Sequence, residues 1–258
     1  MIQIEHTVWD GIPVLICAKQ TDFAKALPVV TYLHGFTGAK EDNLSIAYLL
    51  AEKGFRVILP DAHLHGEREA VDGTQQLGFH FFEMIQQNVV ELETIYQKLT
   101  DANLIKNDSF SLAGTSMGGI STAAALTSYP WITQAGIMMG SAMLYKFSKG
   151  MIEQTRARGV ELPLSEVELN RLFDQLKKLD LSLNIEKLNN RPLFIWHGEA
   201  DEVVPYDHAT GFYQQLKNDS NYTSEVTFVN QKQTGHKVSR QARLALVDWL
   251  AKTSNIEK

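Results

Sequence analysis

The stretch "SLAGTSMGGIS", residues 111–121, decides how this chain is expected to fold. A short apolar run ends at Gly114, and Ser116 then stands between Gly114 and Gly118 before a run of small, helix-compatible residues. A serine at such a sharp strand-to-helix turn is held in a strained backbone conformation with its hydroxyl pointing outwards. Side chains in place of the two glycines would collide with neighbouring backbone. The pattern predicts a nucleophile at Ser116, and a glycine-rich turn with a capping serine is the alternative.

Strand-like and helix-like patterns alternate on both sides of this turn. Strand-like runs cover residues 2–8, 12–19, 28–35, 55–60, 109–114, 134–140, 191–198 and 224–229, and helical spacing covers 43–53, 82–99, 117–128, 206–217 and 239–252. Asp10 and Gly11 join the first two runs and form a hairpin signal. The later strands are largely apolar throughout, which is typical of parallel strands buried on both faces. We therefore expect an α/β fold with a mostly parallel central sheet and flanking helices.

One segment, residues 142–191, interrupts this alternation. It contains charged helical patterns without a convincing strand, and Ser165 and Glu168 form a capping box at the start of one helix. Apolar residues follow the box at helical spacing, namely Leu169, Leu172, Phe173, Leu176 and Leu179. We expect a helical cap at 142–191, inserted in a core domain made of residues 1–141 and 192–258. The apolar stripe is expected either to pack as ordinary core or to roof an apolar pocket.

A serine hydroxyl is a weak nucleophile until a base takes its proton, and in this architecture an acid and a histidine follow the serine along the chain. Asp201 lies just beyond a strand-like run, where catalytic groups gather in open α/β sheets. His236 lies in a polar loop between the last strand and the last helix. We therefore predict that Asp201 orients His236 and that His236 deprotonates Ser116, with Glu199 as the alternative acid.

Negative charge that develops on a substrate oxygen needs preorganised hydrogen-bond donors. Met117, the residue after the predicted nucleophile, supplies one backbone N–H. The loop "HGFTG", residues 34–38, is expected to supply the other through Phe36, and its glycines let the backbone approach the substrate. His34 is expected to be buried and to brace this loop through hydrogen bonds.

The remaining histidines are expected to have structural or surface roles. His197 lies inside a strand-end motif, where a structural hydrogen bond is expected, and His208 lies at the start of a helix, where we expect a surface position. His63 and His65 stand two residues apart near acids, but spacing alone is a weak indication of a metal site. A rigid loop is favoured instead, with internal hydrogen bonds or ion pairs of Asp61, Glu67 and Arg68.

Composition and charge exclude several classes of protein. The 258 residues suffice for one large domain with an inserted subdomain, and the net charge of −6 disfavours a nucleic-acid partner. Cys17 is the single cysteine, so neither an internal disulfide nor a cysteine-based metal cluster is expected. The first residues lack the pattern of a signal peptide, and no apolar run approaches the roughly 20 residues that cross a bilayer. We expect a cytoplasmic protein without a membrane partner.

Five motifs together resemble those of the α/β-hydrolase superfamily, namely "HGFTG", "DAHLHGER", "GTSMGG", "HGEADEVVP" and "GHKVS". They are most similar to small bacterial serine esterases in the branch related to prolyl oligopeptidase, and the resemblance covers about residues 12–252. It implies an α/β-hydrolase fold. It also implies Ser116 as nucleophile, His236 as base and Asp201 as the acid that orients it, with oxyanion N–H groups from Phe36 and Met117.

These patterns predict a serine carboxylesterase that hydrolyses short-chain acyl esters through an acyl-enzyme. Its expected partner is a small-molecule ester, no cofactor or metal is expected, and the oligomeric state is left open. A peptidase or amidase with the same triad is the first alternative, although no residue that would hold a peptide terminus can be identified. A non-catalytic binding protein on the same fold is the second, and it is disfavoured because the predicted triad is complete.

Overall fold

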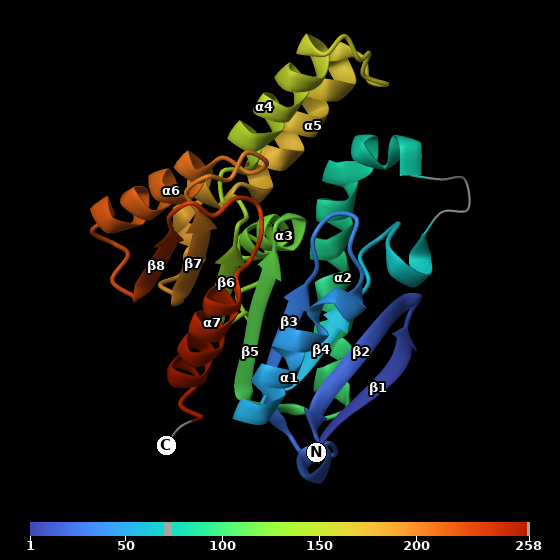
Figure 1. Ribbon diagram of the computed structural model, residues 1–258, viewed down its shortest axis with the longest axis vertical. Helices are drawn as coiled ribbons and strands as arrows, with labels where there is room; N and C mark the ends of the chain where they lie inside the picture. The colour runs from blue at the N-terminus through green and yellow to red at the C-terminus, as the bar shows by residue number, and fades with distance from the viewer. Residues whose placement is uncertain (70–73, 257–258) are drawn as a thin grey trace.

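The computed structural model describes residues 1–69 and 74–256. Within these residues, eight strands form one sheet in the order β1-β2-β4-β3-β5-β6-β7-β8 (Figure 1). The strands are β1 (Ile2–Trp9), β2 (Ile12–Lys19), β3 (Leu27–Leu33), β4 (Arg56–Pro60), β5 (Ile105–Thr115), β6 (Gln134–Met138), β7 (Leu193–Gly198) and β8 (Val226–Gln231). β2 pairs antiparallel with β1 and β4, and every other neighbouring pair is parallel. The predicted α/β fold with a mostly parallel sheet is confirmed.

Helices cover both faces of the sheet (Figure 1). The first face carries α1 (Leu44–Lys53) and α7 (Arg240–Thr253), and the second carries α2 (Phe81–Asp101), α3 (Met117–Ala125) and α6 (Tyr206–Asn218). Along β5, Leu112 packs into the core on the α2 and α3 face, whereas its neighbour Ala113 packs on the α1 and α7 face. Successive residues of a strand point to opposite faces, so a strand covered on both sides is apolar throughout.

The segment between β6 and β7 forms the predicted helices. It contains α4 (Leu144–Ala157), α5 (Glu166–Leu179) and the short 3-10 helices η5 (Leu181–Leu183) and η6 (Ile185–Leu188), and none of its residues, all of them described, lies in a strand. α4 and α5 project as a pair beyond the carboxyl edge of the sheet (Figure 1). The remaining 3-10 helices are η1 (Gln20–Asp22), η2 (Lys40–Asn43), η3 (Gly66–Arg68) and η4 (Thr74–His80).

The capping box at the start of α5 forms as predicted. The Ser165 N–H donates to Glu168 Oε2 at 2.8 Å, and the Glu168 N–H donates to Ser165 Oγ at 3.3 Å. At the base of the pair, buried Asp180 joins the two helices, because its Oδ2 accepts the Tyr145 N–H of α4 at 2.7 Å and its Oδ1 accepts the Ser182 hydroxyl at 2.6 Å. These bonds fix the position at which α4 and α5 leave the core.

The apolar stripe of α5 divides between two surroundings. Leu169 and Leu176 are buried, and Leu172 packs partly buried against the same core. Phe173 instead meets Tyr145 of α4 edge to face, with ring centroids 5.6 Å apart. Most of the stripe therefore packs as core, while Phe173 packs within the α4–α5 pair. Among the described helices, none combines the length and the apolar character that a bilayer crossing requires.

Candidate active site

The turn between β5 and α3 has the geometry that the sequence predicted. Ser116 adopts φ 56° and ψ −116°, a strained conformation for a residue with a side chain. A Cβ added to Gly114 would lie 2.4 Å from backbone atoms of Gly118, and one added to Gly118 would lie 2.2 Å from the Leu33 carbonyl oxygen. Both positions therefore exclude side chains, and the turn holds Ser116 at the carboxyl edge of the sheet.

Ser116, His236 and Asp201 come together at this edge from three separate connections. Ser116 Oγ lies 2.7 Å from His236 Nε2, and His236 Nδ1 lies 2.7 Å from Asp201 Oδ2. A carboxylate only accepts hydrogen bonds, so Nδ1 carries the hydrogen and Nε2 is the acceptor of the serine hydroxyl. In this tautomer His236 can take the proton of Ser116 while Asp201 holds the ring.

The Asp201 carboxylate is buried and is held from both of its oxygens. Its Oδ1 accepts the N–H groups of Val203 at 2.9 Å and Val204 at 3.0 Å. Burial by itself raises the pKa of this carboxyl, but the hydrogen bonds from His197, from His236 and from these two N–H groups outweigh it and hold the pKa of Asp201 well below its usual range. Asp201 therefore stays ionised at neutral pH and keeps the His236 ring oriented.

The loop after β3 places a second donor beside the serine. A Cβ added to Gly35 would lie 3.5 Å from Ser116 Cβ, so this loop runs directly against the turn. Within the described residues, neither the Phe36 N–H nor the Met117 N–H has an acceptor in the protein. Met117 is also the first residue of α3, where the helix dipole favours negative charge. Neither predicted donor is therefore engaged by another group of the described residues.

Two histidines join the loop after β3 to the loop after β4. The Ala62 N–H donates to His34 Nε2 at 2.9 Å, so His34 Nδ1 carries the hydrogen and donates to the carbonyl of the next residue at 2.8 Å. The Thr37 N–H donates to His65 Nε2 at 2.9 Å, and His65 Nδ1 donates to the His63 carbonyl at 2.9 Å. Burial lowers the pKa of His34, which favours its neutral form. The predicted bracing role of His34 is confirmed, and His65 shares it.

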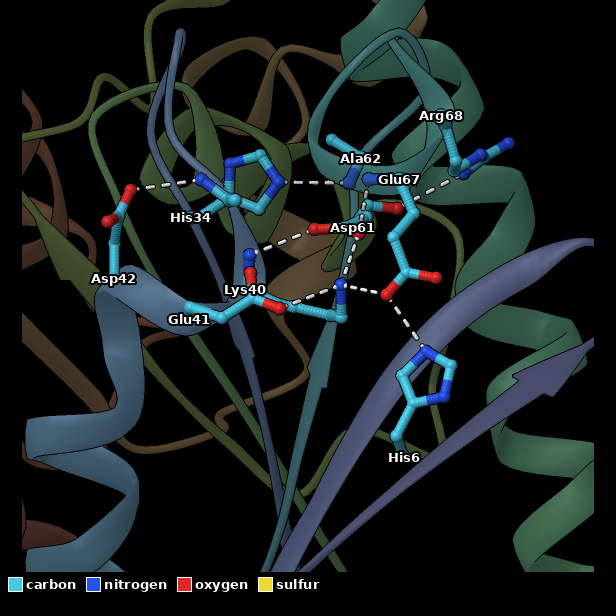
Figure 2. A network of polar contacts seen from close by, with 10 residues as sticks. His6, His34, Lys40, Glu41, Asp42, Asp61, Ala62, Glu67 and Arg68 are labelled. Carbon is cyan, nitrogen blue, oxygen red and sulfur yellow. Dashed lines mark hydrogen bonds and ion pairs between the residues drawn. The ribbon is translucent and has the colours of Figure 1, made fainter.

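A buried ion cluster lies behind the same loop (Figure 2). Lys40 is 1% exposed, and its Nζ lies 2.7 Å from Asp61, 2.6 Å from Glu67 and 3.0 Å from Glu41. Asp61, which is fully buried, also accepts the N–H groups of Lys40 at 2.9 Å and Glu67 at 3.0 Å. Burial disfavours both charges, but the pairing outweighs it, so the pKa of Lys40 is raised and the pKa of Asp61 is lowered. The cluster fixes residue 40, just after the oxyanion loop, against the end of β4.

The internal bonding that the sequence predicted for residues 61–68 is confirmed. Besides the Asp61 and Glu67 contacts, Arg68 donates to both carboxylate oxygens of Glu91 on α2, at 2.8 and 2.7 Å. Lys40 was not predicted, because a lysine in a polar stretch carries no sign that three acids from two loops will meet it.

We expect Asp61→Asn to lower the free energy of unfolding by about 1–3 kcal/mol, because Lys40 loses its buried acid but keeps Glu67 and Glu41. The new amide would turn a donor or a neutral oxygen toward Lys40, which would remain buried with less compensating charge. Asp207→Asn is the matched control, because Asp207 pairs with Lys146 at 2.7 Å on the surface and should change stability by less than about 1 kcal/mol. Urea denaturation measures both, and equal losses would contradict a special role for the buried pair.

The pH dependence of stability gives a further check on this variant. A carboxyl with a lowered pKa in the folded state stabilises the fold above its ordinary value of about 3.9, and this contribution is lost as the pH falls. Asp61 and Asp201 both have lowered pKa values. The free energy of unfolding of the wild type should therefore fall below about pH 4, and the fall should be smaller in Asp61→Asn.

The other candidates from the sequence take different places. Glu199 accepts a hydrogen bond from Asn230 on β8 and makes none with His236. His197 forms the expected structural hydrogen bond. The expected surface position of His208 is wrong: it is 3% exposed, because the start of α6 packs against the connection between β6 and α4, where Ser141 Oγ lies 3.0 Å from His208 Nδ1. Burial lowers the pKa of His208 to about 4, so its ring is neutral.

A row of aromatic rings leads from the loop of residues 34–38 toward α4 and α6. Ring centroids of Phe36 and Phe81 lie 5.6 Å apart, those of Phe81 and Phe147 6.0 Å, and those of Phe147 and His208 6.1 Å. Phe81 and Phe147 are each 7% exposed. The four rings come from a loop and three helices far apart in the sequence, so no local pattern could have grouped them. They form one continuous row of ring contacts that begins at Phe36, called the aromatic wall below.

Comparisons with known proteins identify the family. The model of the prolyl oligopeptidase family matches residues 42–256. A Bacillus subtilis (strain 168) protein named "Putative esterase YitV" is 40% identical over 250 residues, which cover 96% of this chain and 98% of that protein. Esterase YjfP of Escherichia coli (strain K12) is 29% identical over 253 residues, with 96% and 98% coverage.

A solved structure shares the fold over the whole chain. TT1662 from Thermus thermophilus superposes with a TM-score of 0.74 at 18% identity and covers 100% of this chain and 99% of its own. Acetyl xylan esterase 1 from Thermoanaerobacterium sp. superposes with a TM-score of 0.70 at 15% identity, with 97% and 87% coverage. At such identities the likeness concerns the fold.

Proposed function

Because the chain belongs to the prolyl oligopeptidase family of serine hydrolases, we propose that it is a carboxylesterase that forms an acyl-enzyme on Ser116. The observation that carries this proposal is the relay of 2.7 Å hydrogen bonds from Ser116 through His236 to Asp201. The N–H groups of Phe36 and Met117, which donate to no described residue, are the oxyanion donors in this proposal. Nucleophile, base, orienting acid and oxyanion donors are then all assigned.

In the first half of the reaction, His236 Nε2 takes the hydroxyl proton as Ser116 Oγ attacks the ester carbonyl carbon. The carbonyl oxygen becomes an oxyanion, which accepts hydrogen bonds from the Phe36 and Met117 N–H groups. The ionised Asp201 stabilises the imidazolium that His236 becomes. His236 then donates this proton to the oxygen of the leaving alcohol as the bond between that oxygen and the carbonyl carbon breaks. The acyl group remains on Ser116.

In the second half, a water molecule replaces the alcohol. His236 removes a proton from the water as its oxygen attacks the acyl carbon, and the same two N–H groups stabilise the second oxyanion. The bond to Ser116 Oγ then breaks, and Oγ recovers its proton from His236. The acid is released and the enzyme returns to its starting state, with every proton transfer carried by one histidine.

An ester rather than a peptide substrate is favoured by the names of the two curated relatives, both of which are esterases by name. The family's own name favours the alternative, a peptidase or amidase that uses the same triad. We expect kcat/KM for a short-chain aryl ester to exceed that for the matching anilide by at least about 10³-fold, corresponding to about 4 kcal/mol of the barrier. Comparable values for the two substrates would assign the chain to the amidase alternative.

A preference for short acyl groups is proposed from the aromatic wall. Phe81 contacts both Phe36 and Phe147, and Phe81 and Phe147 are buried. We propose that a long acyl chain on this side of the loop of residues 34–38 would meet these rings. α4 supplies Phe147, which gives residues 142–191 their proposed role as a cap over the site. We propose soluble esters with roughly two to six acyl carbons, since a small apolar pocket loses about 1–3 kcal/mol when a chain no longer fits.

We expect Phe147→Val to move the acyl-length optimum toward longer chains, because the smaller side chain opens the wall. The measurement is kcat/KM over a series of esters with increasing acyl length. Phe173→Val is the matched control, because Phe173 lies against Tyr145 within the α4–α5 pair and should leave the optimum in place. A shift produced by Phe173→Val alone, or wild-type activity that still rises at about twelve carbons, would contradict the proposed wall.

A further inference from the structure

Asp201 has a second histidine beside it. His197 is the second-last residue of β7, just before the loop that carries Asp201, and it is 0% exposed. Its Nε2 lies 3.2 Å from Asp201 Oδ2 and 2.9 Å from the Val204 carbonyl oxygen. Both of these atoms are acceptors, so His197 Nε2 must carry a hydrogen that it shares between them.

The opposite side of the ring has no polar neighbour. Nδ1 of His197 is buried and has no hydrogen-bond partner within the described chain. A hydrogen placed on Nδ1 would be a buried donor without an acceptor, which costs free energy. The surroundings therefore select one form, with the hydrogen on Nε2.

The donor from His197 completes the set around the carboxylate. Oδ1 accepts the N–H groups of Val203 and Val204, and Oδ2 accepts His236 at 2.7 Å and His197 at 3.2 Å. A carboxylate with donors on both oxygens cannot rotate without breaking a bond. A donor at Oδ2 also withdraws charge from the oxygen that holds His236, so the carboxylate attracts the proton of the imidazolium less strongly.

We propose that His197 is a positioning residue of the triad, which fixes the Asp201 carboxylate and weakens its hold on protonated His236. The proposal rests on the proposed function, because it concerns the acid that orients the base. The donor is the Nε2–H of a fully buried side chain, which the Val204 carbonyl oxygen also holds in place. His197 thereby holds in place the carboxylate that accepts the His236 Nδ1 hydrogen.

Other charged and titratable groups lie near Asp201, His236 and His197, and substitutions at His197 leave all of them unchanged. α6 presents Tyr206, whose ring lies 5.9 Å from that of His197, and the neutral His208. The loops contribute Glu199, which bonds to Asn230, and Lys237, which follows His236 in the chain. The pair of Lys146 with Asp207 lies on the surface beyond His208. A difference between variants at His197 therefore reports the Nε2 donor.

The test compares three substitutions at this position. His197→Phe keeps a ring without a donor, and His197→Gln places an amide N–H₂ where Nε2 lies. His197→Asn is polar but too short to reach Oδ2. For the Phe variant we expect kcat to fall about tenfold, while KM stays within about twofold of the wild-type value. We also expect the acidic limb of its plot of kcat/KM against pH to move up by about half to one pH unit. The Gln variant should retain most of kcat and the wild-type limb.

Circular dichroism and thermal unfolding first establish that each variant folds. If the Phe variant does not fold, the Asn variant carries the same expectation. Wild-type kcat and pH limb in a folded Phe or Asn variant would overturn the proposal, as would a Gln variant that behaves like the Phe variant. Failure of the triad itself is distinguishable, because Ser116→Ala would then retain turnover whatever the His197 variants do.

Discussion

Ser116→Ala is expected to lower kcat for ester hydrolysis by at least about 10⁵-fold, because loss of the nucleophile removes the covalent route altogether. The fold should persist, since alanine is smaller than serine and Ser116 Oγ makes its hydrogen bond to His236 alone. Initial rates on a short-chain aryl ester, measured at high enzyme concentration, set the upper limit of the residual activity.

Ser141→Ala is the matched control for this loss. Ser141 is also a buried serine with a histidine nearby, 3.0 Å from His208, but it precedes α4, and no acid among the described residues is hydrogen-bonded to His208. Its hydroxyl accepts the Met143 N–H at 3.1 Å, so its removal should lower stability and leave most of the turnover. A reversed result, with turnover lost in the Ser141 variant and retained in the Ser116 variant, would move the nucleophile to the Ser141–His208 pair.

Asp201→Asn is expected to lower kcat by about 10⁴-fold, the size of effect found when a triad acid is neutralised. The asparagine side chain is of similar size, but it can present an amide N–H₂ to His236 Nδ1 and so favour the wrong tautomer. It also removes the charge that stabilises the imidazolium. The pH dependence of kcat, measured alongside, should show that no pH restores the lost activity.

Glu199→Gln is the control for the acid. Glu199 lies two residues before Asp201 and bonds to Asn230 on β8, away from the His236 ring. A change within about threefold in kcat is expected, as for a surface substitution outside the triad. The opposite order of the two effects would make Glu199 the orienting acid and refute the assignment of Asp201.

The sequence predicted the parts of this molecule that local rules determine. A Cβ at Gly114 or Gly118 would lie about 2.2–2.4 Å from backbone atoms, so only glycine fits at these two positions. Such a requirement appears directly in the local sequence, as the Gly-x-Ser-x-Gly pattern. The alternation of apolar strands and amphipathic helices is also a local pattern, and it predicted the mostly parallel sheet. His34 could be assigned a bracing role because it precedes the glycine of a strand-end loop.

The parts that the sequence did not predict depend on contacts between distant segments. Lys40 is buried because acids from its own loop and from the loop after β4 meet its ammonium group. His208 lies at a helix start that the sequence pattern predicts to be exposed, but the connection between β6 and α4 covers it. Phe81 and Phe147 are 66 residues apart in numbering and meet only after α2 and α4 have packed.

The central claim is that the reaction passes through a covalent bond to Ser116. A fluorophosphonate probe, which reacts with activated serine hydroxyls, should add one label to the folded wild type and abolish turnover in proportion to labelling. Intact mass and peptide mapping should place that label on the peptide that contains Ser116, and Ser116→Ala should remain unlabelled. A label on another residue, or full turnover in protein labelled at Ser116, would contradict the account.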